Sequence, residues 1–115
     1  MTIWERTKAA LTGLGVQMAA NVLLVTSGSD YPDLYLVYML ISAPSEQFAD
    51  NKETVRSYRM QVSVYSRTGL VSLPDVNSAM VAAGFARSTM TELPFNQVTK
   101  FYGLALEFIF VESEN

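Results

Sequence analysis

The stretch Tyr58-Arg59-Met60-Gln61-Val62-Ser63-Val64-Tyr65-Ser66 decides the fold of this 115-residue chain. Apolar and polar residues alternate along it, and a strict period of two is the pattern of a β-strand with one buried face. We predict a strand over residues 55–66. Its core face holds Tyr58, Met60, Val62 and Val64, and its polar face holds Ser57, Arg59, Gln61, Ser63 and Tyr65.

An apolar segment, residues 34–41, precedes this strand and predicts a second strand that is apolar on both faces. The long polar connection between the two, residues 43–54, has Phe48 as its single large apolar side chain. Such a segment buries too little apolar surface to order itself, so we expect a mobile loop. Phe48 would either anchor this loop on a neighbouring molecule or fold back on its own sheet as part of a solvated hairpin tip.

Two helices are predicted. The first covers residues 2–14, because Thr2 and Glu5 have the spacing of a capping box and Trp4, Lys8 and Leu11 recur at helical intervals. The second begins at Ser72, with Pro74 in its first turn, and ends at Gly84. Residues 16–26 fit either a strand or a helix.

The C-terminal part predicts a strand over residues 85–92, a turn at 93–96 and a last strand over 99–111. The last strand is apolar on both faces except at Glu107. We therefore expect one domain, residues 1–115, of the α+β class: a mainly antiparallel β-sheet with two α-helices packed on one face. Two helices cannot cover both faces, and the surplus apolar surface predicts a partner, most simply another copy of the chain.

The amino-acid composition excludes several classes of enzyme and metal site. The chain has no His and no Cys, which removes the commonest general base, the commonest metal ligand and every thiolate site. We predict that the protein is not an enzyme and has no catalytic, cofactor-binding or metal-binding residues; a carboxylate-based enzyme is a distant alternative. The longest apolar run is far shorter than the roughly 20 residues of a membrane-spanning helix, so no membrane partner is expected.

The candidate interface residues are Phe48, Asp50, Arg59, Arg67 and Glu107. Arg59 and Arg67 share a polar strand face with Tyr65. Because the net charge of the chain is −3, this face is better interpreted as a solvated surface or a polar contact between subunits than as a nucleic-acid site. Glu107, an acid within an apolar strand, predicts an interface salt bridge or an edge position that faces water.

Several segments carry a resemblance to a known family. They are the first helix closed by Gly13 and Gly15, the strands Tyr35-Leu36-Val37-Tyr38-Met39-Leu40-Ile41-Ser42 and Tyr58 to Ser66, the loop Phe48-Ala49-Asp50-Asn51, and the helix end Ala82-Ala83-Gly84-Phe85. In this order they resemble the tail completion proteins of long-tailed bacteriophages, also called tail terminator or tail-to-head joining proteins.

The resemblance implies a structural virion protein, assembled in the host cytoplasm, that caps the tail tube as a ring and joins the tail to the head connector. It also implies the partners: further copies of the chain in a hexamer, the tail tube protein, the head–tail connector or stopper protein, and DNA only as cargo passing through the lumen. No functional side chain is carried over from the family.

Two alternatives remain open. The first is a neck or head-completion protein on the portal side. The second is a dimeric α+β small-molecule binding module with an apolar pocket among Tyr35, Tyr38, Tyr58 and Phe108.

Overall fold

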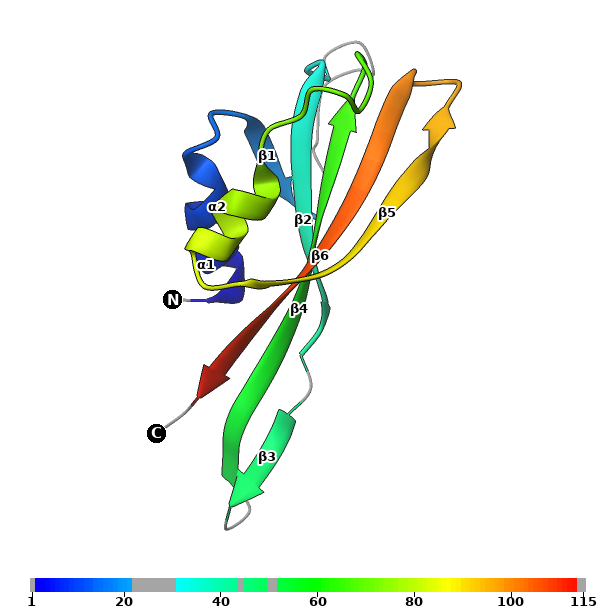
Figure 1. The fold of residues 1–115 in the computed structure, drawn as a ribbon. Coiled ribbons are helices and arrows are strands. Elements are labelled where there is room, and N and C mark those ends of the chain that lie inside the picture. Colours follow the sequence, from blue (N-terminus) through cyan, green and yellow to red (C-terminus); the bar gives the residue numbers. More distant parts are fainter. Residues whose placement is uncertain (1, 22–30, 44, 50–51, 114–115) are drawn as a thin grey trace.

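The computed structural model describes residues 2–21, 31–43, 45–49 and 52–113 (Figure 1). Its elements, in chain order, are α1 (Ile3–Thr12), β1 (Gln17–Ala20), β2 (Leu34–Ser42), β3 (Ser45–Ala49), β4 (Lys52–Ser66), α2 (Val76–Ala82), β5 (Ala86–Asn96) and β6 (Phe101–Ser113). The strands form one six-stranded sheet in the order β1-β2-β4-β6-β5, with β3 paired to β4. Only the β1–β2 pair is parallel among these ladders. The predicted α+β class is confirmed.

Strand β4 is the centre of the sheet. It pairs with β2 on one side and with β6 on the other over most of its length. Its inward residues Met60, Val62 and Val64 are at most 1% exposed and lie in a core that includes side chains of both helices. Both helices therefore pack on the same face of the sheet, as predicted.

Ser63 lies on the predicted polar face of β4 but is buried there, at 4% exposure. The ladders place Ser63 opposite Val37 of β2 and Ala105 of β6. A small side chain in a central strand is covered by its larger neighbours, even on the face away from the helices.

Helix α1 begins at the predicted capping box. The Glu5 N–H donates to Thr2 Oγ1 at 3.1 Å, and the Thr2 N–H donates to the Glu5 carboxylate at 2.8 Å. The buried stripe, however, consists of Ile3, Thr7 and Leu11, whereas Trp4 of the predicted stripe is 41% exposed. Thr7 can lie in the core because its hydroxyl donates to the Ile3 carbonyl at 2.8 Å.

Helix α2 begins later than Ser72. Asp75 is its N-cap and accepts from the Ser78 N–H at 3.1 Å and the Ser78 hydroxyl at 2.7 Å. Pro74 therefore precedes the helix instead of standing in its first turn. At the other end Gly84 has φ +98°, a left-handed conformation that ends a helix at low steric cost.

Strands occur in the unassigned segment 16–26 and in the predicted loop 43–54. Within residues 16–26, Gln17–Ala20 forms β1, parallel to β2, and residues 22–30 lie outside the described part. The prediction of an unstructured loop over 43–54 was wrong for Ser45–Ala49, which pairs with β4 as a hairpin. Figure 1 shows β3 and the beginning of β4 extending away from the helices as an arm.

Strand β5 continues through the predicted turn at 93–96 to Asn96. Pro94 is compatible with a strand here because β5 is at the edge of the sheet, where one side needs no backbone donor. The turn follows instead at 97–100, where Asn96 Oδ1 accepts from the N–H groups of Val98 and Thr99.

Candidate functional site

The face of the sheet opposite the helices, hereafter the open face, carries the candidate site. No described helix packs on it. Its side chains come from alternate residues of β2, β4 and β6, which the ladders set side by side. Met39 of β2 and Val111 of β6 expose 38% and 58% of their surface there. The prediction that β2 and β6 are apolar on both faces is thus confirmed, and the open face presents apolar surface to solvent.

A polar cluster lies in the middle of the open face. Arg59 Nη1 is 3.8 Å from Glu107 Oε1 and 3.5 Å from Ser88 Oγ, and the Thr89 hydroxyl donates to Glu107 Oε2. The structure thus brings together two of the predicted interface residues, Arg59 and Glu107, as an ion pair within one chain. Because both side chains are partly exposed, the pair contributes about 0–1 kcal/mol to stability.

Sequence reasoning missed Ser88 and Thr89. The register of β5 against β6 shifts between Arg87 and Met90, so both residues lie opposite the stretch around Glu107. A β-bulge of this kind leaves no clear mark in the local sequence.

Arg67 lies at one end of the open face, away from the Arg59–Glu107 pair in its middle. Its Nη1 donates to the Tyr31 carbonyl at 3.1 Å and to Asp33 Oδ1 at 3.2 Å. Its guanidinium carbon is 4.5 Å from the centre of the Phe101 ring, a cation–π distance. Arg67 therefore holds the residues just before β2 against the beginning of β6.

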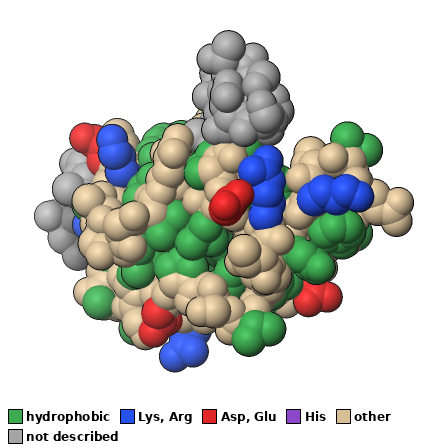
Figure 2. All heavy atoms as spheres, turned by 90° about the horizontal axis from the view of Figure 1, so that it is seen from above, with side chains coloured by type: hydrophobic (Ala, Val, Ile, Leu, Met, Phe, Trp, Pro, Cys, Tyr) green, Lys and Arg blue, Asp and Glu red, His purple; other side chains and the backbone are tan. Residues whose placement is uncertain are grey.

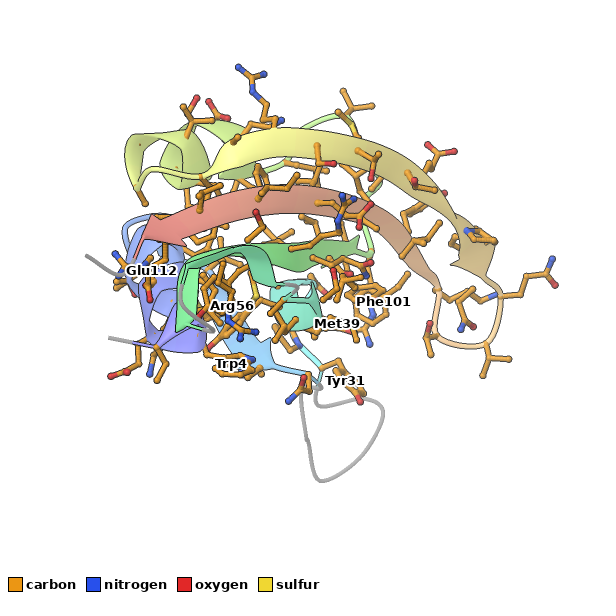
Figure 3. All side chains as sticks on the ribbon, turned by 90° about the horizontal axis from the view of Figure 1, so that it is seen from below. Trp4, Tyr31, Met39, Arg56, Phe101 and Glu112 are labelled. Carbon is orange, nitrogen blue, oxygen red and sulfur yellow. The ribbon has the colours of Figure 1, made fainter. Side chains whose placement is uncertain are left out.

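Four aromatic side chains meet beside Arg67, and we call them the aromatic cluster: Tyr31, Tyr35, Tyr65 and Phe101. Tyr35 stacks on Tyr65 with ring centres 5.1 Å apart and on Tyr31 at 5.5 Å. Phe101 meets Tyr31 and Tyr35 edge to face, at 6.2 and 5.3 Å; Tyr31 and Phe101 are labelled in Figure 3. Offset and edge-to-face contacts are the favourable geometries for such rings.

The aromatic cluster forms one wall of a pocket of about 320 Å³. The remaining lining residues are Leu93, Pro94, Asn96, Thr99 and Gly103. Figure 2 views the molecule from above, onto the end of the sheet where β2 begins and β4 ends, and shows hydrophobic side chains exposed there among polar ones. The described part of the lining contains aromatic, apolar and neutral polar groups and no charged side chain.

Gly103 is required by the close packing behind this pocket. A Cβ on Gly103 would lie 2.9 Å from Leu93 Cδ1 and 3.3 Å from Tyr65 Cε1. The missing side chain lets Leu93 and Tyr65 approach from the two neighbouring strands. Gly103 thus forms the floor of the pocket.

Tyr35 is the most enclosed phenol of the cluster, at 9% exposure. Burial raises the pKa of Tyr35 above its ordinary value; the nearby phenols of Tyr65 and Tyr31 raise it further, against a smaller opposing effect of Arg67. The hydroxyl therefore stays protonated at neutral pH and can donate a hydrogen bond.

The pocket predicted among Tyr35, Tyr38, Tyr58 and Phe108 does not form. Tyr38, Tyr58 and Phe108 belong to the core under the helices, whereas Tyr35 lies on the open face with Phe101. Successive side chains of a strand point to opposite faces, so residues 35 and 38 cannot line one cavity.

The two other predicted interface residues are Phe48 and Asp50. Phe48 lies in β3, paired with Glu53, but the surroundings of its side chain lie outside the described part. Asp50 lies outside the described residues altogether. Within the described ranges, no group of three or more acidic side chains is placed to hold a metal ion, and no helix there is long and apolar enough to cross a membrane.

No protein-family model matches the chain, and no curated protein matches it either.

Proposed function

We propose that this protein is a structural virion component that caps the tail tube as a ring and joins the tail to the head connector. The observation that carries the proposal is the open face. Both helices pack on the other side of the sheet, while β2 and β6 present exposed apolar side chains on this one. The virion role and the expected number of six copies in the ring rest on the family resemblance of the sequence.

The composition of the open face suits contact between subunits. Met39 and Val111 are apolar and exposed, and the Arg59–Glu107 pair joins β4 to β6 on the same face. An apolar surface with a few fixed polar groups is typical of interfaces between copies of one chain. A ring requires a heterologous contact, in which the open face of one subunit meets a different surface of the next.

The shape and charge are compatible with such a ring. The described part measures 53 × 27 × 24 Å, and the arm gives each subunit reach toward a neighbour. A net charge of −3 disfavours adhesion of DNA, which suits a lumen through which DNA passes.

The test is the stoichiometry of the protein on assembled tails. Tail tubes are assembled with the wild-type chain, with Met39→Asp, or with Val71→Asp, and imaged by negative-stain microscopy. Val71 is fully exposed outside the sheet and is a matched control for adding a charge at an apolar surface residue. We expect a terminal ring with wild type and Val71→Asp, and its loss with Met39→Asp.

Other outcomes point to the alternatives. A ring that binds portal particles but not tail tubes would favour the neck or head-completion role. A two-fold dimer in solution, absent from tails, would favour the small-molecule binding module, and the pocket beside the aromatic cluster is the observation in its favour.

A further inference from the structure

The pocket beside the aromatic cluster contains an unused hydrogen-bond donor. Tyr35 is nine-tenths buried and lines the pocket. Its hydroxyl makes no hydrogen bond with any described residue. Among the described side chains, the one polar atom that is both shielded from solvent and without a hydrogen-bond partner is Arg6 Nε, so the Tyr35 hydroxyl is not shielded. The Tyr35 hydroxyl therefore reaches solvent, and it does so from a pocket wall.

Asn96 supplies a second donor to the same pocket. Its Oδ1 already accepts from two backbone N–H groups, those of Val98 and Thr99, so its side-chain NH₂ is the group left to bind something else. The lining also holds the hydroxyls of Tyr31, Tyr65 and Thr99. Several donors beside aromatic surface fit a ligand that is apolar and offers hydrogen-bond acceptors.

The geometry disfavours a cationic ligand. An aromatic cage binds a cation on exposed ring faces, but here Tyr35 is stacked between Tyr31 and Tyr65. Arg67 already lies over the Phe101 ring and would repel a second cation. Among the described residues of the lining there is also no carboxylate that would attract one.

We propose that this pocket binds a short, proline-bearing, extended segment of a partner protein. Proline has no backbone N–H and therefore presents only acceptors to Tyr35 and Asn96. The polyproline II conformation leaves every carbonyl without an internal hydrogen bond, and aromatic-lined grooves recognise such segments. The prolyl ring packs against Tyr31, Tyr65 and Pro94, while the Tyr35 hydroxyl donates to a peptide carbonyl.

The size of the pocket limits the ligand to a few residues. Its volume of about 320 Å³ is at the lower end of the roughly 300–1,000 Å³ of ligand sites. We therefore expect a Kd in the range of about 10 μM to 1 mM for an isolated peptide. The pocket lies on the open face, but the titration below uses the isolated chain and does not require the ring, so it can fail or succeed separately from the proposed function.

The test is a titration of the full chain, labelled with ¹⁵N, with a blocked octaproline peptide. A blocked Gly-Ser peptide of the same length is the control ligand. We expect saturable shifts of amide signals at Phe101 and Gly103 with octaproline and none with the Gly-Ser peptide.

Two variants test whether octaproline binds through the Tyr35 hydroxyl. Tyr35→Phe removes only the hydroxyl, and we expect it to weaken octaproline binding about three- to tenfold, the usual effect of one hydrogen bond. Tyr102→Phe removes a hydroxyl from the adjacent part of β6 outside this pocket lining, and we expect an unchanged Kd.

The proposal is overturned if octaproline causes no saturable shift at about 1 mM, or if Tyr35→Phe binds it as tightly as wild type. Stronger binding of tetramethylammonium or of a free sugar than of octaproline would also overturn it, because the site would then recognise a different chemistry.

Discussion

Aspartate substitutions at Val62 and Ser63, neighbours on opposite faces of β4, should have very different costs. Val62 is 0% exposed and lies in the core under both helices. Val62→Asp places a carboxylate among apolar side chains with no donor near it. A polar group buried without a partner costs several kcal/mol, and a charge costs more. Against a total stability of about 5–15 kcal/mol, we expect Val62→Asp to be unfolded.

Ser63→Asp adds a carboxylate on the open face instead. Ser63 is also buried, so this substitution also lowers the free energy of unfolding. However, Gln61 Nε2 already donates to Ser63 Oγ at 3.0 Å and can donate to the new carboxylate. We expect a loss of about 1–3 kcal/mol.

Urea unfolding followed by circular dichroism measures both variants, with Val62→Ala as a size control. Val62→Ala should cost about 2–3 kcal/mol, from two lost methyl groups and the cavity they leave. Equal unfolding midpoints for Val62→Asp and Ser63→Asp would refute the assignment of the two faces.

Three further outcomes are expected. Met39→Asp should leave the thermal midpoint of the isolated subunit within a few degrees of wild type but abolish the ring on tails, as counted by microscopy. Phe48→Ala should likewise spare subunit stability and impair tail attachment, whereas a large loss of stability in denaturation would place Phe48 in the subunit core. The Ser78 side chain and N–H lower the pKa of Asp75, and the Thr2 N–H and hydroxyl lower the pKa of Glu5. The two ionised carboxylates therefore stabilise the fold fully above the ordinary carboxylate pKa. This stabilisation is lost as the pH falls through the lowered pKa values. Denaturation midpoints of an Asp75→Asn, Glu5→Gln double variant should accordingly change less between neutral and acidic pH than those of wild type, and an identical pH profile would contradict this.

Much of the fold was predictable because local patterns agreed with the tertiary structure. The alternation around Val62 located β4, and the Thr2–Glu5 capping box fixed the start of α1. The errors occurred where tertiary context overrode local signals. Thr7 is polar but enters the core through its bond to the Ile3 carbonyl, and Pro94 lies in a strand because that strand is at the edge.

The candidate site was much less predictable. Arg59 and Glu107 were singled out separately, but their contact depends on the pairing of β4 with β6. The aromatic cluster joins Tyr35, Tyr65 and Phe101 from three strands, and the floor at Gly103 faces Leu93 from a fourth. Such contacts depend on register between distant segments, which no local pattern specifies.

The irregular course of β5 has a consequence for how this sheet can meet other molecules. An open edge with a long row of free N–H and C=O groups is a template for adding strands from other chains, and such addition leads to fibrils. In β5 the register shifts twice, between Arg87 and Met90 and between Leu93 and Asn96, and Pro94 removes a donor within the second interruption. The β5 edge is therefore a poor template for adding a strand from another chain.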